Sequence, residues 1–528
     1  MRPARPVRSG LALRALALAL LLAPAVACSG AAPPAALPPT PPGAAAARAP
    51  QATFTALGSK AVLAVAMRYP VEKVVEAPPL SLTASDGTGL RLTSLDARAV
   101  VEGPLAFTEL HLAFENPLDR VLEGRFAVTL PPGATVSRLA MKTADGKWQE
   151  AEVVEKQAAR VAYEDALHHR QDPALLEREA GNEVRARVFP IPARATKEII
   201  VSYSQEIAAG RRYRLPLRGL PEVARLRVTA DVAGKRATLE RSAYRPDQDF
   251  EAALPAGAPG LRSDDVALVR VRPDLGAEQA PTRELVLLFD TSASRALGFS
   301  REVARLGELV AALAKGGAAG AHLVVAAFDQ TVEPIYEGPI AGFSQRELDA
   351  LLARRPLGAS DLAGAVAWLG TARPGARAVL VTDAVTTTGS SDAAIAAARG
   401  LRGKIARLDV LLAGGIRDDE AARRLARGAL EQDGVVLDAA GDVAETARRL
   451  ALTTRSGITV DVASASWVWP ERLDGMQPGD EAIVYALLKK GAVPADALHV
   501  TLGGSIAQEL DVRTAPADKP LVERAAAN

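Results

Sequence analysis

The sequence predicts a multidomain protein with an N-terminal β-rich domain, β-sandwich-like flanking segments and an α/β doubly wound domain. Three observations support this prediction. A chain of 528 residues exceeds what one hydrophobic core organises. Apolar and polar residues alternate through much of 78–207, which is the period of a half-buried strand. Between 283 and 453, short apolar runs alternate instead with amphipathic helical stretches, which is typical of a parallel sheet covered on both faces.

The composition excludes several classes of protein. Hydrophobic residues make up 48% of the chain, which is enough for folded domains. The 63 Lys and Arg residues balance 62 Asp and Glu residues, so the chain lacks the basic excess of a nucleic-acid-binding protein. Five histidines and one cysteine leave no Cys-ligated zinc site and no intramolecular disulfide.

The N-terminus is typical of an export signal. Residues 1–28 begin with Arg2, Arg5 and Arg8, continue with an apolar stretch interrupted by Arg14, and reach Ala25-Val26-Ala27-Cys28. Ordinary signal peptidase could cleave after Ala27. Small residues before a lone cysteine also resemble a bacterial lipobox, which implies lipidation of Cys28 and a membrane-anchored lipoprotein of the cell envelope, in the periplasm or at the outer membrane. Residues 29–75 are an Ala/Pro-rich linker that cannot bury a core and is expected to act as a stalk.

The segment 78–207 is expected to be mainly β. Phe107, Leu110, Leu112 and Phe114 mark the alternation of one strand. One interruption, 155–170, has helical spacing and ends in two adjacent histidines. Neighbouring helical residues point in different directions, so we expect His168 and His169 to be a solvated helix end rather than a metal site.

Ordered matches through this segment resemble the vault protein inter-alpha-trypsin (VIT) domain. The residues that carry the resemblance are Phe114-Glu-Asn116, Glu123-Gly-Arg-Phe126, Leu130-Pro131, Met141, EKQAARVAYEDAL, Leu175-Leu176-Glu177, Gly181-Asn182 and VFPIPARATKEIIVSY. The resemblance implies a β-rich interaction module without catalytic residues. Such a domain is often followed by a von Willebrand factor type A (VWA) domain, as in proteins similar to inter-alpha-trypsin inhibitor heavy chains.

Two further β segments, 208–282 and 456–515, flank the α/β domain. Each is too small to stand alone, so we expect them to pack together as one discontinuous β sandwich. Residues 516–528 form a tail that begins like a helix, and we expect it to be poorly packed.

The α/β domain, 283–453, is expected to be Rossmann-like and to place its ligands at the carboxyl ends of its strands. The strand candidates are ELVLLFD, HLVVAAFD, RAVLVTDA, RLDVLLAG and GVVLDAA. Helix candidates between them are SREVARLGELVAALAK, SQRELDALLARR, SDLAGAVAWLGTA, SDAAIAAARGL and DDEAARRLARGAL.

Oxygen-bearing side chains gather where these strands end. They are Asp290, Ser292, Ser294, Ser360 and Asp383. Two carboxylates and three hydroxyls are hard donors that suit Mg²⁺ or another divalent cation such as Mn²⁺ or Ca²⁺. Each residue also has a simpler interpretation, because Ser294 and Ser360 could cap helices and the two aspartates could be ordinary polar strand ends.

In combination, these five residues resemble the metal-ion-dependent adhesion site of VWA domains. Asp290, Ser292 and Ser294 fit its D-x-S-x-S motif, Asp383 matches its later acidic residue, and Ser360 stands where the family usually has threonine. The resemblance implies a protein partner that offers an acidic side chain to the metal.

The sequence therefore predicts a cell-envelope protein that binds a partner through a divalent cation and is not an enzyme. Two alternatives stay open. One is a structural module that assembles with copies of itself. The other is a hydrolase, which the sequence favours less because it has no G-x-S-x-G, H-E-x-x-H or P-loop motif.

Overall fold

The structure is a computed structural model, and it describes residues 78–528 except 144, 151, 155–173, 179–180, 209, 255–259, 281, 490–496, 518 and 528. The predicted signal and linker, Cys28, the expected helix at 155–170 and the histidine pair at its end lie outside these residues. Within the described ranges, none of the helices has the length and apolar character needed to cross a bilayer.

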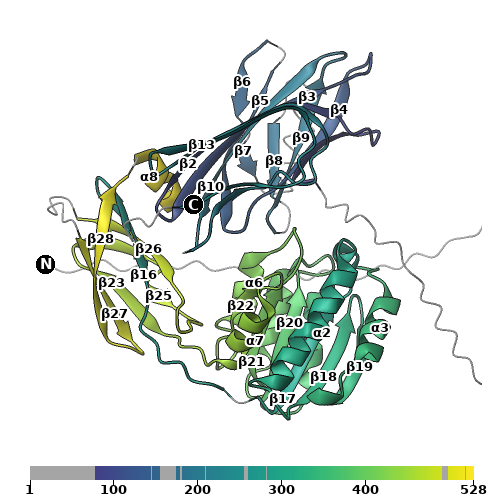
Figure 1. Ribbon diagram of the computed structural model, residues 1–528, viewed down its shortest axis with the longest axis vertical. Helices are drawn as coiled ribbons and strands as arrows, with labels where there is room; N and C mark the ends of the chain where they lie inside the picture. The colour runs from purple at the N-terminus through teal and green to yellow at the C-terminus, as the bar shows by residue number, and fades with distance from the viewer. Residues whose placement is uncertain are drawn as a thin grey trace, which may run out of the picture. The chain divides into compact units, whose positions relative to one another are not determined.

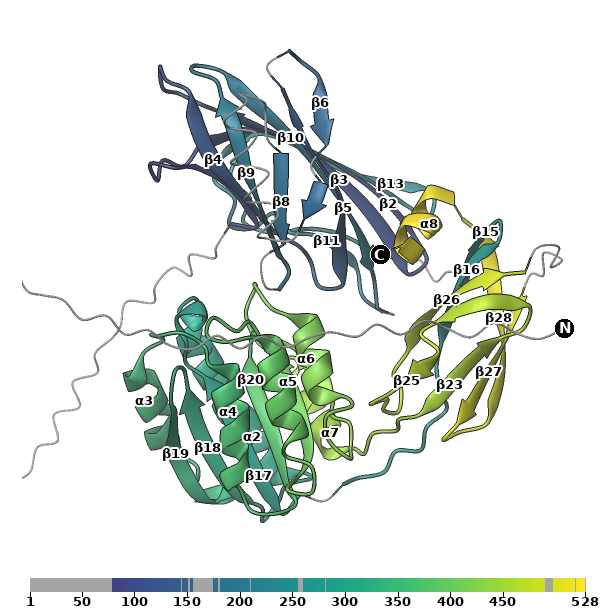
Figure 2. The ribbon, with the colours of Figure 1, turned by 180° about the vertical axis from the view of Figure 1, so that it is seen from behind.

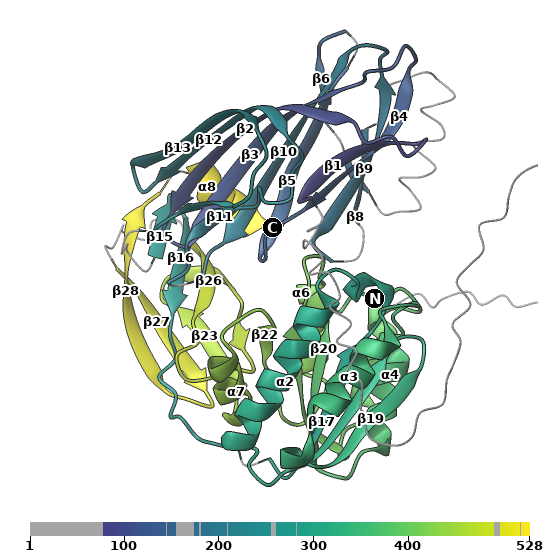
Figure 3. The ribbon, with the colours of Figure 1, turned by 45° about the vertical axis from the view of Figure 1, so that its right-hand side comes forward.

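The N-terminal domain consists of two main sheets with a hydrophobic core between them (Figure 1). The first has the order β1 (Leu80–Ala84), β4 (Leu122–Thr129), β9 (Glu183–Ile191), β8 (Ala174–Arg178), β7 (Glu152–Val154). The second, seen in Figure 3, has the order β13 (Lys235–Tyr244), β12 (Val223–Val232), β2 (Arg91–Glu102), β3 (Leu105–Glu115), β10 (Thr196–Glu206), β5 (Ala134–Lys142), β6 (Trp148–Glu150). A two-stranded sheet pairs β11 (Tyr213–Leu215) with β14 (Phe250–Ala252).

The alternation predicted for 78–207 holds on β3 for three of its four marked residues, whereas Phe107 is half-buried and out of phase with them. Leu110, Leu112 and Phe114 on β3 are buried, while the residues between them are only half-buried. Phe114 meets Phe126 of the facing sheet edge-on, with ring centroids 6.2 Å apart. This contact joins the two sheets through aromatic packing.

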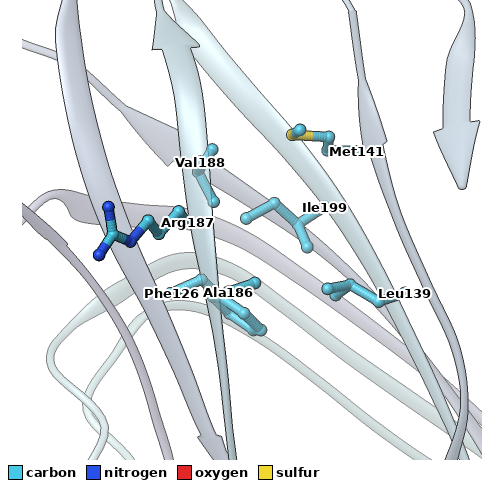
Figure 4. A pocket seen from close by; sticks show the side chains of 7 residues that line it. All are labelled: Phe126, Leu139, Met141, Ala186, Arg187, Val188 and Ile199. Carbon is cyan, nitrogen blue, oxygen red and sulfur yellow. The ribbon is translucent and has the colours of Figure 1, made fainter. Parts of the chain in front are cut away.

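A small apolar pocket opens into the core of this domain (Figure 4). Its lining side chains are Phe126, Leu139, Met141, Ala186, Arg187, Val188 and Ile199. The guanidinium of Arg187 points away from the other six. The pocket thus offers apolar carbon and no polar group that would orient a ligand.

The structure divides the flanking segment 208–282 between two sheets. Strand β12 pairs in parallel with β2, from Arg225↔Ser94 to Val232↔Val101, so β12 and β13 extend the N-terminal sheet. Strands β15 and β16 instead pair with the C-terminal strands β28 and β26. The expectation of one sandwich built from all of 208–282 and 456–515 is corrected accordingly, because β2 offers β12 a free sheet edge.

The C-terminal strands form one eight-stranded sheet with β15 and β16, and this sheet has a second hydrophobic core. That order is β24 (Ala465–Trp469), β26 (Ala482–Leu488), β16 (Val266–Val271), β15 (Gly260–Ser263), β28 (Gln508–Pro516), β27 (Ala497–Gly504), β23 (Ile458–Val462), β25 (Arg472–Leu473). The tail forms α8 (Lys519–Ala527). Its Leu521 and Val522 are buried beside Leu261 and Leu268, so the tail is packed, contrary to expectation.

The α/β domain has a six-stranded sheet of the doubly wound type. Its order is β19 (Val332–Pro339), β18 (His322–Phe328), β17 (Glu284–Asp290), β20 (Ala376–Thr382), β21 (Ile405–Leu412), β22 (Val436–Asp438). All neighbours are parallel except the edge strand β19. Counted from β17, the order is 3-2-1-4-5-6, so the chain reverses direction across the sheet between β17 and β20.

Helices cover both faces of this sheet, as the fold prediction requires. Figures 1 and 2 show the two faces in turn, with α2, α3 and α7 on one and α4, α5 and α6 on the other. The helices are α2 (Phe299–Lys315), α3 (Gln345–Arg354), α4 (Leu362–Trp368), α5 (Ser391–Arg399), α6 (Asp419–Ala426) and α7 (Val443–Ala451). Short 3₁₀ turns are η1 (Ala293–Arg295), η2 (Ile340–Gly342) and η3 (Leu369–Thr371).

Candidate metal centre

The two candidate carboxylates lie at the point where the strand order reverses. Asp290 is the last residue of β17, and Asp383 directly follows β20. The register pairs Phe289 with Val381, so the next residue on each strand, Asp290 and Thr382, also lies side by side. In doubly wound sheets, ligands bind at the carboxyl ends of the strands, at the point where the strand order reverses.

Hydrogen bonds join four of the five candidate residues into a continuous chain. The backbone N–H of Ser292 donates to Oδ1 of Asp290 at 2.9 Å. The hydroxyls of Ser292 and Ser294 lie 3.1 Å apart. Ser294 Oγ then donates to Oδ2 of Asp383 at 2.6 Å. Segments that are 89 residues apart in the sequence therefore meet through side-chain oxygens.

Ser360 reaches the same place on a separate loop. The carbonyl of Gly358 accepts from the N–H of Ala293 at 3.0 Å, which fastens this loop beside the Ser292 turn. On the other side, the Ser360 N–H donates to Thr387 Oγ1 at 2.7 Å, and Thr387 lies four residues after Asp383. The loop that carries Ser360 is thus fastened both to the turn after β17 and to the segment after Asp383.

Burial is uneven across the five residues. Asp290, Ser292, Ser360 and Asp383 are each at most 2% exposed, whereas Ser294 is exposed. Ser294 is therefore the member of the set that solvent reaches.

The set also fits a hard cation chemically. The hydroxyl oxygen of Ser360 is buried and has no hydrogen-bond partner among the described residues. A buried polar atom without a partner costs free energy and calls for an explanation, such as an ion. No group of three or more His, Cys, Asp or Glu side chains in the described ranges could hold a metal, so any ion here depends on hydroxyl ligands as well as carboxylates.

The electrostatics of the site are those of two buried acids held close together. Burial, and after it the charge of Asp383, raises the pKa of Asp290 from 3.8 to about 6. Hydrogen bonds from Thr382 and Ser292 oppose this rise without cancelling it. The raised pKa means that burial and the charge of Asp383 outweigh the stabilisation that these hydrogen bonds give to the ionised carboxylate of Asp290.

Three residues that support the site did not stand out in the sequence. Thr382 Oγ1 donates to Asp290 Oδ2 at 2.6 Å and so joins the two strand ends. Ala384, fully buried after Asp383, has φ 58°, an uncommon value for alanine, and the turn there lets the Val385 N–H donate to Asp383 Oδ1 at 2.9 Å. A hydroxyl directly before Asp383 was the available signal for Thr382, whereas nothing in the sequence marks the backbone of Ala384.

The third residue is Arg295, a buried cation behind the carboxylates. Its Nη1 lies 3.6 Å from Asp383 Oδ2 and donates to the Ala413 carbonyl at 2.8 Å, and its Nη2 pairs with Glu302. Burial opposes the charge, but Glu302 first, and then the two site aspartates, outweigh burial and raise the pKa of the guanidinium. A charged residue directly after D-x-S-x-S was the signal for it in the sequence.

Comparisons with known proteins identify the N-terminal domain. Residues 92–203 match the model of the vault protein inter-alpha-trypsin domain family, so the chain contains this domain. No curated protein is similar enough in sequence to count as a match.

Several solved structures resemble parts of the chain at low similarity. One is described as "von Willebrand factor type A from Catenulispora acidiphila", with 15% identity, TM-score 0.28, and coverage of 51% of this chain and 72% of that one. Manganese-loaded TRAP protein of Plasmodium vivax has 15% identity and TM-score 0.26, covering 41% and 96%. The pilus adhesin SpaC of Lactobacillus rhamnosus GG has 12% identity and TM-score 0.24, covering 48% and 46%. At these values, the fold of the α/β domain rests on its own strand order and register.

Proposed function

We propose that this chain, which carries a VIT domain followed by a doubly wound α/β domain, binds a protein partner through a divalent cation. Asp290, Ser292, Ser294, Ser360 and Asp383 would hold the cation, with Mg²⁺ as the expected ion and Mn²⁺ or Ca²⁺ as substitutes. The observation that carries the proposal is the hydrogen-bonded chain from Asp290 to Asp383, which lies where the strand order reverses and includes the exposed Ser294.

A bound cation would supply positive charge at this site and attract a carboxylate from the partner. Mg²⁺ takes six oxygen ligands and keeps waters where the protein supplies too few, so an acidic side chain can replace a water. The chain's own part is to hold the hydroxyls and carboxylates in place before the ion arrives.

Catalysis is not part of the proposal. Hydrolysis by a serine or a metal-activated water would need a base in reach of the reacting proton. The three described histidines have other partners: His111 bonds Glu109 in the VIT domain, His322 lies at the opposite end of the parallel strands beside Glu284, and His499 bonds Asp511. None of these contacts involves a residue of the site.

Partner binding is tested by capture from a solubilised native envelope fraction. The wild-type chain is used in Mg²⁺ and in EDTA, beside Asp290→Ala, Asp383→Ala and a matched control, Asp349→Ala. Asp349 is an exposed acid on α3 of the same domain and hydrogen-bonds Gln345. A partner should be retained by wild type and Asp349→Ala in Mg²⁺ and be lost in EDTA and in both site variants. Undiminished capture by Asp290→Ala would refute the metal-dependent mechanism.

The alternative of self-assembly is separated by a measurement on the pure protein. Light scattering in Mg²⁺ and in EDTA gives its mass in both states. A mass that rises only with Mg²⁺ would indicate that copies of the chain bind one another, whereas an unchanged mass agrees with a different partner.

Export and anchoring complete the proposal and rest on the sequence of residues 1–28. Cys28 would be the lipidated N-terminus of the mature chain, in the periplasm or at the outer membrane. Mass spectrometry of the N-terminal peptide from native membranes tests this directly. A peptide that begins at Cys28 and carries acyl chains is expected, and an unmodified peptide would contradict lipidation.

A further inference from the structure

Arg295 is a buried positive charge beside a proposed cation site, where a second positive charge is not expected. It is 2% exposed, and its Nη1 lies 3.6 Å from Oδ2 of Asp383, the oxygen that also accepts from Ser294. A buried positive charge at this distance repels a divalent ion and attracts the carboxylate that should bind it.

The guanidinium is held firmly in this position. Glu302, in the first turn of α2, pairs with Nη2, and the Ala413 carbonyl accepts from Nη1. Gly414 makes room for the group, because a Cβ at that position would lie 2.3 Å from Nη1. Arginine suits such a place, since its planar fork satisfies several acceptors at once.

The site contains a positive charge as well as acidic groups, unlike a simple acidic cluster. Asp383 lies beside the Arg295 cation, and Arg295 is itself paired with the carboxylate of Glu302. Neutralising Arg295 therefore adds to the attraction for a metal, whereas neutralising Glu302 leaves Arg295 uncompensated and reduces that attraction.

We propose that Arg295 is a resident counter-cation of this site. In the metal-free protein it relieves the repulsion between Asp290 and Asp383 and steadies Asp383. In doing so it sets the affinity for a divalent cation lower than the same five side chains would otherwise have, and Glu302 limits this effect. The inference rests on the proposed metal site and deepens it, since it makes Arg295 a positioning residue that tunes occupancy.

The test compares Mn²⁺ affinities, measured calorimetrically on the full chain, for four variants. Arg295→Gln should bind Mn²⁺ about tenfold more tightly than wild type, and Glu302→Gln about tenfold more weakly. Arg295→Lys, which keeps the charge, should stay close to wild type, and the double variant Arg295→Gln with Glu302→Gln should fall between the single variants.

The opposite signs are what separate this role from a structural one. Simple damage to the fold would weaken Mn²⁺ binding in all the variants. Weaker or equal binding by Arg295→Gln would therefore overturn the proposal.

A second measurement does not depend on any metal. In EDTA, Arg295→Gln should melt at a lower temperature than wild type, and adding Asp383→Asn should restore part of that loss because the repulsion is removed. If wild type binds no Mn²⁺ while this rescue occurs, the metal site fails and the counter-cation role stands. If Asp383→Asn gives no rescue, the counter-cation role fails.

Discussion

The hydroxyl of Ser294 donates a 2.6 Å hydrogen bond to Oδ2 of Asp383, across 89 residues of sequence. This contact joins the turn after β17 to the end of β20 at the reversal point of the sheet. Ser294 is exposed and Asp383 is buried, so this hydrogen bond also marks where the site meets solvent. Under the proposed function, we therefore expect the partner's carboxylate to approach from the Ser294 side.

Ser360→Ala should separate stability from metal binding. The Ser360 hydroxyl is buried without a partner, so removing it should leave the free energy of unfolding in EDTA unchanged or raise it by up to about 1 kcal/mol. Mn²⁺ affinity should fall about tenfold, since one ligand is lost, which corresponds to roughly 1.4 kcal/mol. Denaturant titration and calorimetry check the two parts.

Ser390→Ala is the matched control for that change. Ser390 caps α5 by accepting from the Ala393 N–H, so its loss should cost about 1 kcal/mol of stability and leave Mn²⁺ affinity as it is. If Ser360→Ala destabilised the metal-free protein as much as Ser390→Ala, the Ser360 hydroxyl would have a structural partner after all.

Thr382→Val should weaken both the fold and the site. Valine keeps the shape of the side chain but cannot donate to Asp290, so a buried carboxylate loses a 2.6 Å hydrogen bond. We expect a loss of about 1–3 kcal/mol in the free energy of unfolding and a reduced Mn²⁺ affinity. Thr371→Val, which removes an exposed bond to the Trp368 carbonyl, serves as control and should change neither measurably.

The metal-free protein should lose stability as the pH rises through the range where Asp290 ionises. The pKa of Asp290 is about 6 in the fold against 3.8 as the ordinary value, so the folded state binds the proton more tightly. The protonated Asp290 therefore contributes on the order of 3 kcal/mol to the free energy of unfolding. This contribution is complete below about pH 4 and is lost between about pH 4 and pH 6.

The difference between wild type and Asp290→Asn isolates this contribution from the other acids. In EDTA, the stability of wild type relative to Asp290→Asn should fall over that range and then level off. Saturating Mn²⁺ should reverse the trend, because the cation favours the ionised carboxylates. A constant difference from pH 4 to pH 7 in EDTA would show that Asp290 ionises normally.

Two exposed leucines border the site and should contact the partner. Leu297 is 57% exposed three residues after Ser294, and Leu357 is 64% exposed three residues before Ser360. The Leu357 N–H bonds the Thr291 carbonyl at 3.2 Å, which fixes it beside the D-x-S-x-S turn. Leu297→Ser and Leu357→Ser should each weaken partner capture about fivefold to tenfold and leave Mn²⁺ affinity unchanged.

Val121→Ser provides the comparison for these leucines. Val121 is 55% exposed and belongs to the N-terminal domain, so its change should not alter capture by the metal site. Equal losses in all three variants would mean that exposed apolar surface in general, rather than the border of the site, retains the partner.

The α/β domain could be predicted well because each of its central strands is a continuous apolar run. ELVLLFD became β17 with the bounds expected, and hydrogen bonds join Asp290, Ser292, Ser294 and Asp383 at the end of this strand. Strand β19 was missed because it is an antiparallel edge strand with two prolines and mostly solvent-facing residues. Helix α7 was also not singled out, since alanine and arginine dominate its nine residues.

The division of the flanking segments could not be predicted in the same way. β12 alternates like any half-buried strand, and nothing local reveals that its partner is β2, about 130 residues earlier. Likewise, the buried position of Arg295 depends on the Ala413 carbonyl and on Glu302, contacts that form only in the folded chain. Contacts between residues far apart in the sequence determine both the partner of β12 and the position of Arg295.

Anomalous diffraction from crystals soaked in Mn²⁺ tests the central claim most directly. The account predicts a manganese peak among the oxygens of Asp290, Asp383 and the three serines, at about 2.0–2.6 Å from those that bind it directly and farther from any that bind it through water. Crystals of Asp290→Ala should lack this peak. A wild-type map without a peak at the carboxyl ends of β17 and β20, at Mn²⁺ concentrations that occupy other sites, would contradict the account.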